Sequence, residues 1–126
     1  MHQIAIESLG LENGKLSETT LRPDIARWSL NMAAYEVTMK RAMDEAKAGQ
    51  SLGAASSFFK YYGTELNKNR YELELSIGGA RGLAWEGEEY DDGQLARYFC
   101  RTKGNSIEGG TTEIQLNIIA KRIFGL

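Results

Sequence analysis

The chain has 126 residues, of which 42% are hydrophobic and 25% are charged, a balance typical of one globular domain with a single core. A formal net charge of −2 without a basic stripe argues against nucleic acid as a partner. The sequence contains no apolar run of the ~18 to 20 residues that span a bilayer and no basic segment at its start, so we expect a cytoplasmic protein without a membrane anchor.

Cysteine and histidine are too scarce to form a disulfide framework or a metal site. The one cysteine, Cys100, has no partner for an internal disulfide, which fits a reducing compartment. The one histidine, His2, lies next to the terminus. Metal sites with nitrogen and sulfur ligands need several such side chains, so we predict no metal.

The first twenty residues carry a weak helical signal and include Gly10 and Gly14, so we expect an irregular or partly helical lead-in over residues 1–20. A long helix is then predicted over about 21–49. Pro23 suits its first turn, where the missing N–H is not needed, and Gly49 supplies its stop. Apolar residues recur along it at steps of three and four, which predicts one buried stripe: Leu21, Ile25, Trp28, Met32, Tyr35, Met39, Ala42 and Ala46.

A second long helix is predicted up to a glycine-rich stretch at residues 77–83. Its apolar stripe contains Ala55, Phe59, Tyr62, Leu66, Leu73 and Ile77. Gly78, Gly79 and Gly82 allow positive φ angles and close approach of the backbone to another group. Between Glu86 and Asp92 five of seven residues are acidic, which is typical of a solvated loop.

Two shorter helices complete the predicted fold. One spans about Asp92 to Lys103, with Leu95, Tyr98 and Phe99 as its apolar residues. The other begins at Thr112, where Gln115 can bond back to the Thr112 N–H in a capping box, and ends at Gly125. Its isoleucines are expected to pack on the core: Ile114, Ile118, Ile119 and Ile123. We therefore predict an all-α fold, an antiparallel four-helix bundle of the up-and-down type over residues 21–126.

Chemistry is concentrated in residues 105–115, which we call the diglycine segment. It combines the carboxylate of Glu108 with Gly109, Gly110 and a helix start. Glycines let successive N–H groups converge on an oxygen-rich ligand, and the helix start adds a favourable potential for phosphate or a developing oxyanion. A carboxylate there can act as a general base where apolar surroundings raise its pKa. The alternative, which local chemistry alone favours, is a tight turn that only caps the helix.

Residues 106–126, Ser-Ile-Glu-Gly-Gly-Thr-Thr-Glu-Ile-Gln-Leu-Asn-Ile-Ile-Ala-Lys-Arg-Ile-Phe-Gly-Leu, resemble the closing signature of the acyl-CoA dehydrogenase family. The preceding helices resemble the same domain in the same order, from about Leu16. The resemblance implies the carboxy-terminal helical domain of a three-domain enzyme that uses FAD to convert an acyl-CoA thioester to the 2-enoyl-CoA. It implies as partners the acyl-CoA substrate, the remaining domains of the enzyme, and further copies in a homodimer or tetramer. The chain by itself is expected to be inactive.

The resemblance also assigns site residues by position. Thr111 and Glu113 correspond to residues that contact FAD beside the closing signature. Three residues correspond to the turn that contacts the FAD of a neighbouring subunit: Ser76, Gly78 and Gly79. For Ser76 a local hydrogen bond at the helix end is the alternative, and for Thr111 a helix cap.

Glu108 is the candidate catalytic base that the resemblance offers. Many family members place the glutamate directly before a single Gly-Thr, whereas Gly109 takes that position here. Other branches take the base from an upstream helix, and an exposed turn carboxylate is the alternative role for Glu108. Two other functions also fit the sequence: a stand-alone, non-catalytic helical dimerisation module, and a fragment of an acyl-CoA oxidase-like flavoenzyme.

Overall fold

The computed structural model describes residues 1–126, apart from the side chain of Glu89. The elements in chain order are α1 (His2–Leu9), β1 (Leu11–Glu12), β2 (Lys15–Leu16), α2 (Leu21–Lys47), α3 (Ala55–Gly82), η1 (Glu88–Gly93), α4 (Gln94–Lys103), η2 (Gly104–Ser106), α5 (Thr112–Ile119) and η3 (Ala120–Phe124). The two strands form one short antiparallel hairpin. The predicted all-α class is confirmed.

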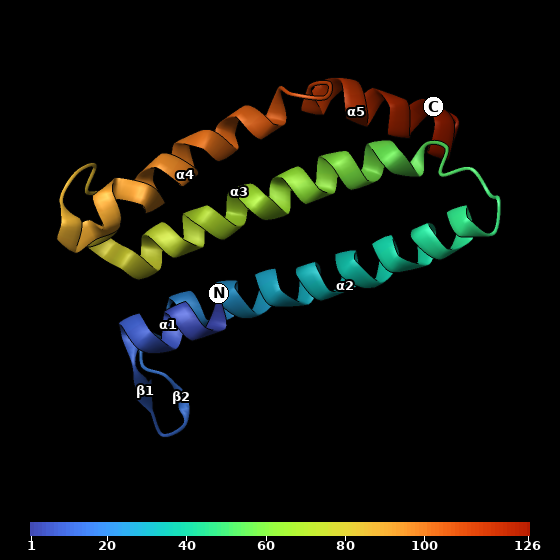
Figure 1. Ribbon diagram of the computed structural model, residues 1–126. Coiled ribbons are helices and arrows are strands. Elements are labelled where there is room, and N and C mark those ends of the chain that lie inside the picture. The colour runs from blue at the N-terminus through green and yellow to red at the C-terminus, as the bar shows by residue number, and fades with distance from the viewer.

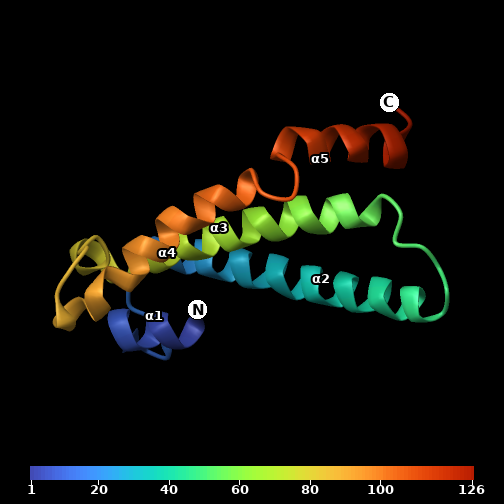
Figure 2. The same cartoon turned by 45° about the horizontal axis from the view of Figure 1, so that its top comes forward.

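Helix α3 lies at the centre of the molecule. It packs against α2 on one side and against α4 and α5 on the other (Figures 1 and 2). Helix α2 runs antiparallel to α3, while α4 and α5 follow one another in the same direction along its other side. The four predicted helices therefore form three antiparallel rows, and α3 alone contacts all the others among these four.

The long helix α2 has the predicted start and the predicted buried stripe. Pro23 lies in its first turn, and the chain leaves the helix at Gly49, whose φ of 86° is in the left-handed region. The predicted stripe faces α3. Ile25 and Ala42 are buried, Ala46 is exposed, and the other residues of the stripe are half-buried: Leu21, Trp28, Met32, Tyr35 and Met39. Helical periodicity thus identified the face that packs on α3.

Residues 1–20 are more regular than the sequence indicates. They form α1 and the β1–β2 hairpin, whose turn residues Asn13 and Gly14 have φ angles of 51° and 73°. Asn-Gly with two positive φ angles is the favoured two-residue hairpin turn. The completely buried Ala5 of α1 packs against Ile25 and Ile77, so α1 joins the start of α2 to the end of α3.

The predicted contacts of the last helix are wrong at two positions. Ile114 is 52% exposed and Ile123 is also exposed, whereas the buried residue of α5 is Gln115. The physical reason is that α5 lies on α3 along a narrow stripe, with Ile118 and Ile119 half-buried, and its remaining faces stay open. The chain continues as a short π-helix, η3, to Phe124.

The glycine-rich end of α3 and the acidic stretch form a sharp turn into α4. Gly79 interrupts α3 with φ 55° and ψ −138°. The acidic residues whose side chains the structure describes are exposed, as predicted: Glu86, Glu88, Asp91 and Asp92. Much of the acidic stretch, however, forms the short helix η1 and not an open loop. Gly93 ends η1, and a Cβ there would lie 2.2 Å from the carbonyl oxygen of Trp85. This approach requires glycine, and α4 begins just after it, at Gln94.

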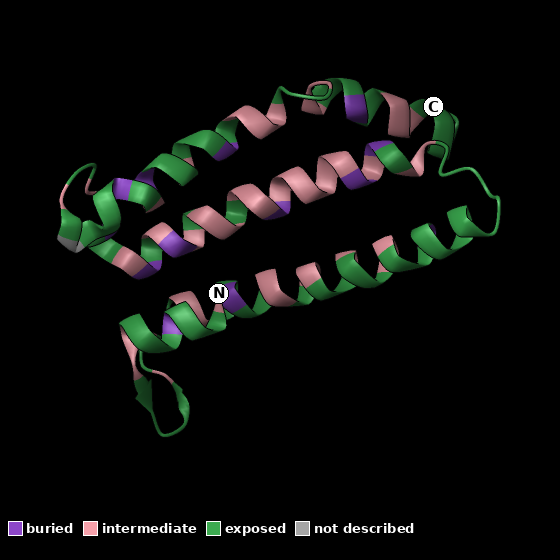
Figure 3. Ribbon diagram, in the orientation of Figure 1, coloured by how far each residue is buried: buried purple, intermediate pink, exposed green. Residues whose placement is uncertain are grey.

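Much of the outer surface is apolar and uncovered. The accessible area is 8390 Å², about a quarter more than the ~6,700 Å² typical of a monomer of 14.0 kDa. On α2, Leu30 is 73% and Val37 is 70% exposed, and Phe124 of η3 is similarly open. Figure 3 shows the outer faces of α2 and α5 as largely exposed. In the part of the chain that the structure describes, no helix is both long enough and apolar enough to cross a bilayer.

We predict that Ile25→Ala destabilises the chain by ~2 to 5 kcal/mol, because it leaves a cavity where α1, α2 and α3 meet. Ile25 is 3% exposed and belongs to the core cluster. Urea unfolding followed by circular dichroism measures the change. Leu30→Ala, on the open face of the same helix, is the matched control and should change the stability by less than ~0.5 kcal/mol. Equal losses for the two variants would contradict this packing.

Candidate functional site

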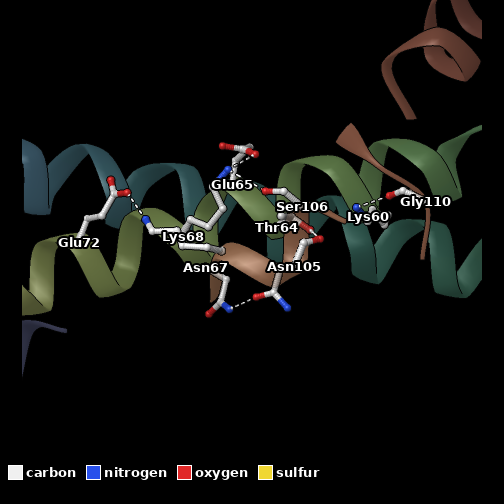
Figure 4. Close-up of polar contacts among 10 residues, drawn as sticks. Lys60, Thr64, Glu65, Asn67, Lys68, Glu72, Asn105, Ser106 and Gly110 are labelled. Carbon is white, nitrogen blue, oxygen red and sulfur yellow. Dashed lines mark hydrogen bonds and ion pairs between the residues drawn. The ribbon is translucent and has the colours of Figure 1, made fainter. Parts of the chain in front are cut away.

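The polar face of α3 holds the diglycine segment and the end of α4 in place. Figure 4 shows side chains of α3 in contact with Asn105, Ser106 and Gly110. The bonds are Lys60 Nζ to Gly110 O at 2.6 Å, Lys68 Nζ to Ser106 Oγ at 3.0 Å, Asn67 Nδ2 to Asn105 Oδ1 at 3.0 Å, and Lys103 Nζ to Glu72 Oε1 at 2.6 Å. Between η2 and α5 the diglycine segment has no helix or strand, and side chains of α3 hold it at both ends of this stretch.

The spacing of the α3 residues explains this arrangement. Side chains three or four positions apart on a helix lie on the same face, and steps of three and four residues continue that face over several turns. The polar residues that contact the segment or the end of α4 follow this spacing: Lys60, Thr64, Asn67, Lys68 and Glu72. Helix α3 therefore has two working faces, an apolar one against α2 and a polar one that holds the segment.

The two glycines of the segment have backbone angles that other residues rarely adopt. Gly109 has φ 66° and Gly110 has φ 95°. Their carbonyl oxygens are both bonded, the first to Gln115 Nε2 at 2.9 Å and the second to Lys60. A Cβ on Gly110 would lie 2.7 Å from Gln115 Nε2, whereas a Cβ on Gly109 would meet no atom closer than 4.0 Å. Gly110 therefore has an angle that favours glycine, and a side chain there would displace the amide of Gln115.

Helix α5 begins one residue earlier than a cap at Thr112 would place it. Thr111 is the cap, and its Oγ1 accepts a hydrogen bond from the Ile114 N–H at 3.4 Å. The predicted capping box between Thr112 and Gln115 is wrong, because Gln115 instead donates to the carbonyl of Gly109. With the cap at Thr111, the residue that would complete a box is Ile114, which has no polar side chain. The hydroxyl of Thr112 is buried and has no hydrogen-bond partner among the described residues.

Several backbone N–H groups at this helix start are unused. Within the described part of the chain, the N–H groups of residues 109–112 make no hydrogen bond. The first N–H groups of any helix lack partners inside the helix, and they carry the positive end of its dipole. Here the two glycines extend this row of free donors beyond the helix. The arrangement can bind an oxygen-bearing group such as a phosphate or a carbonyl.

Glu108 is held by a cation instead of lying in an apolar pocket. Arg101 Nη2 lies 3.0 Å from Glu108 Oε2 and 3.3 Å from Oε1, and the Asn105 amide also donates to Oε1. The hydrogen bonds from Arg101 and then from Asn105 lower the pKa of the Glu108 carboxyl below its ordinary value. A general base near neutral pH needs a raised pKa, so this geometry is unfavourable for that role.

Glu113 is likewise an exposed carboxylate stabilised in its charged form. Its pKa is lowered by its own backbone N–H, then by the Thr111 hydroxyl, and also by the charge of Lys60. The carboxylates of the segment therefore each have a nearby cation. Among the described residues, no three His, Cys, Asp or Glu side chains gather closely enough to hold a metal ion.

The predicted site residues fall into two separate groups. Glu108, Thr111 and Glu113 lie together in the diglycine segment. Ser76, Gly78 and Gly79 lie at the far end of α3, where Ser76 Oγ donates to the Glu72 carbonyl at 2.9 Å. Ser76 is sixteen residues beyond Lys60 on α3, which corresponds to ~24 Å along the helix. The hydrogen bond of Ser76 is the local one considered as its alternative.

Sequence reasoning did not identify three residues that shape this site: Lys60, Arg101 and Gln115 as a carbonyl donor. Arg101 lies seven residues before Glu108 on a helix that leads directly to it, so charge spacing could have suggested the pair. Lys60 is 50 residues from Gly110 in sequence, and no local pattern relates them. Its contact arises from the packing of α5 on α3.

Comparison with known proteins supports the sequence resemblance. The family model for the carboxy-terminal domain of acyl-CoA dehydrogenases matches residues 12–124. Acyl-CoA dehydrogenase IpdE1 of Mycolicibacterium smegmatis is 40% identical over 55 residues, which cover 44% of this chain and 14% of that protein. Acyl-CoA dehydrogenase IpdE1 of Mycobacterium tuberculosis is 38% identical over 60 residues, or 48% of this chain and 15% of that protein. The matched part is thus a small share of each relative, and no solved structure matches significantly.

We predict that Gly110→Ala destabilises the chain more than Gly109→Ala does. Both substitutions place a side chain at positive φ, which costs ~1 to 2 kcal/mol, but the Gly110 substitution also displaces Gln115 from the Gly109 carbonyl. The additional loss should be ~1 kcal/mol or more in urea unfolding. If the two alanine variants have the same stability, the contact between Gly110 and Gln115 does not form as described.

We also predict that the Glu108 carboxyl titrates below its ordinary pKa and that Arg101→Ala moves this pKa upward. A carboxyl with a lowered pKa stabilises the fold above its unfolded pKa, and this contribution disappears as the pH falls through the folded value. The difference in stability between the wild type and Arg101→Ala should therefore shrink in acid. Side-chain NMR titration measures the pKa directly. Glu113, whose pKa is lowered by other groups, is the internal control and should be unaffected.

Proposed function

The chain belongs to the acyl-CoA dehydrogenase family, whose carboxy-terminal domain matches residues 12–124, and we propose that it is this domain of an FAD-dependent enzyme. The proposed reaction is the α,β-dehydrogenation of an acyl-CoA thioester to the 2-enoyl-CoA in the cytoplasm. FAD, when bound, supplies the redox chemistry by accepting the hydride. The part of this chain is to contribute FAD contacts and a surface for the other domains and subunits.

The free N–H groups of the diglycine segment carry this proposal. FAD has pyrophosphate and ring carbonyl oxygens, and unpaired N–H groups beside a helix start suit such acceptors. Thr111 and Glu113 are the residues of the segment proposed to contact FAD. The buried, unpaired hydroxyl of Thr112 supports the fit, because a polar group in such a place needs a partner.

The distance along α3 supports two different flavin contacts. Ser76 lies ~24 Å from the level of Lys60 along α3, and Gly78 and Gly79 follow it in the chain. We propose that they contact the FAD of a neighbouring subunit, while the diglycine segment contacts a second FAD. Each chain would then take part in two flavin sites, which makes assembly of the subunits a condition for complete sites.

The ion pair between Glu108 and Arg101 is unfavourable for Glu108 as the catalytic base. Proton transfer at the α-carbon of the thioester needs a carboxylate whose pKa is raised by its surroundings. Glu108 has the opposite environment in the described conformation, because Arg101 and Asn105 hold its oxygens. For Glu108 to act as the base, substrate binding would have to remove it from Arg101. A base from a part of the enzyme outside this chain requires no such change.

The exposed apolar surface supports the proposal that this chain binds other domains and subunits. Open faces carrying Leu30 and Val37 on α2, and Phe124 after α5, exceed what a monomer of this size usually exposes. We propose that the remaining domains of the enzyme and further copies in a homodimer or tetramer cover them. A stand-alone dimerisation module would also cover one face, but it gives no role to the free N–H groups at the diglycine segment.

The cofactor role is tested with Thr111→Asp in a protein that combines this chain with the flavin-bearing domains. Aspartate also caps helices well, but its negative charge would repel the oxygens of FAD, and it replaces the hydroxyl that donates to Glu113. We expect FAD affinity to fall by at least tenfold, or ~1.4 kcal/mol, and the melting temperature of the apoprotein, measured in parallel, separates this loss from any loss of stability. Thr111→Ser is the matched control and should bind FAD normally. The chain alone should bind FAD poorly.

Each alternative function gives a different result in this experiment. Unchanged FAD affinity in Thr111→Asp would contradict the proposed contact, and an assembly that binds no flavin would favour a non-catalytic module. Hydrogen peroxide formed from oxygen during substrate turnover would identify the oxidase-like alternative. A stable yellow complex of FAD with the chain alone would also contradict the proposal that the flavin site is shared.

A further inference from the structure

We propose that Lys60 and Gln115 are positioning residues that turn the N–H groups of Gly110 and Thr111 outward, toward an oxygen-bearing ligand. The inference rests on the proposed function in one respect, because it takes that ligand to be FAD. Neither side chain needs to touch the ligand. Both act on the backbone carbonyls of the two glycines: Gln115 from the end of the diglycine segment, and Lys60 from α3, 50 residues away in the sequence.

The first observation is that both carbonyls of the diglycine are anchored to the protein. Gln115 Nε2 donates to Gly109 O at 2.9 Å, and Lys60 Nζ donates to Gly110 O at 2.6 Å. Gln115 is buried in α5, and Lys60 lies half-buried on the face of α3 toward the segment. The bond from Lys60 is charge-assisted and short, which is the stronger class of hydrogen bond. Two packed helices therefore hold two successive peptide planes.

The second observation is the geometry of the peptide group itself. The carbonyl of Gly109 shares a peptide plane with the N–H of Gly110, and the carbonyl of Gly110 shares one with the N–H of Thr111. In a trans peptide the C=O and N–H point in opposite directions, and the chain has no cis peptide. Both N–H groups consequently point away from the side chains that hold the carbonyls, and neither has a partner in the described part of the chain.

The third observation is that the glycines permit this orientation and the side chains select it. Gly109 and Gly110 have φ angles of 66° and 95°. Glycine can adopt many other backbone conformations at similar energy, so the glycines alone do not fix this one. A flexible diglycine would lose orientational entropy on binding a ligand. Anchoring of the carbonyls removes that freedom before the ligand arrives. Lys60 and Gln115 thus prearrange two donors that would otherwise rotate.

Charge offers a competing explanation for Lys60. Its ammonium group also lies near enough to Glu108 and Glu113 to stabilise their negative charges. A lysine that acted only by charge would attract an anionic cofactor without any effect on the peptide planes. Gln115 separates the two explanations, because it is neutral and makes the same kind of bond to the preceding carbonyl.

The orientation is tested on the 126-residue chain by N–H residual dipolar couplings, which report the direction of each N–H. We expect Lys60→Met to change the coupling of Thr111 and Gln115→Leu to change that of Gly110, while amides within α3 keep theirs. Lys60→Arg should restore the wild-type coupling. Lys68→Met is the matched control, because Lys68 is also on α3 but holds Ser106. If Lys60→Met leaves the Thr111 coupling unchanged, the positioning role is refuted.

The consequence for the ligand is tested by FAD binding to the apoprotein that combines this chain with the flavin-bearing domains. Lys60→Met and Gln115→Leu should each weaken FAD about tenfold, as expected for loss of one well-oriented hydrogen bond, and Lys60→Arg should bind within about threefold of the wild type. Lys47→Met, on the exposed end of α2, should bind normally. Normal FAD binding by Gln115→Leu, or equal weakening by Lys60→Arg and Lys60→Met, would overturn the role toward FAD. A wild-type assembly that binds no FAD refutes the proposed function, whereas the couplings still decide the orientation.

Discussion

The architecture depends on one helix with two different faces. Helix α3 packs an apolar stripe against α2 and uses its polar face to hold the diglycine segment, in particular through the charge-assisted bond from Lys60 to the Gly110 carbonyl. The apolar face supplies most of the driving force for packing, since burial of apolar area is the dominant favourable term. The polar face contributes specificity: it fixes which part of the segment lies at which level of α3. The irregular stretch between η2 and α5 thereby acquires a defined backbone.

The sequence predicted the parts of the fold in which a single periodic pattern decides the structure. The stripes of α2 and α3 extend over many turns, so small local conflicts do not change the result. Residues 1–20 were underestimated because α1 has few turns, and its burial depends on Ala5 packing against Ile25 and Ile77, far away in the chain. The Asn13-Gly14 turn was the one strong local signal there. For α5, amphipathic spacing was a poor guide because only one narrow side of it meets α3.

The residue types of the candidate site could be recognised in the sequence, but the contacts that hold the site in place could not. Glycines, a hydroxyl and a carboxylate next to a helix start can be read from adjacent residues. Whether the helix is capped by Thr111 or Thr112 cannot, because both are good caps and tertiary contacts decide. In the structure Gln115 donates to the Gly109 carbonyl, and Thr111 accepts from the Ile114 N–H, so the helix starts one residue earlier than a cap at Thr112 predicts. The roles of Lys60 and Arg101 depend on how α4 and α5 lie along α3, and no local rule gives that.

In the proposed function, the diglycine segment forms only one wall of the flavin site. Its free N–H donors lie just before and at the start of α5, and exposed apolar side chains such as Ile107 and Ile114 lie nearby in the chain. A ligand bound there would lose water on the side of this chain and keep it on the other, unless a second surface closes over it. Under the proposed function that surface belongs to the other domains, so FAD would bind the assembled protein more tightly than this chain alone. Linkage then works in both directions: a cofactor that prefers the assembled state also stabilises the assembly by the same free energy. Under the proposed function, the uncovered apolar surface and the incomplete flavin site have one explanation: the stable unit extends beyond this domain.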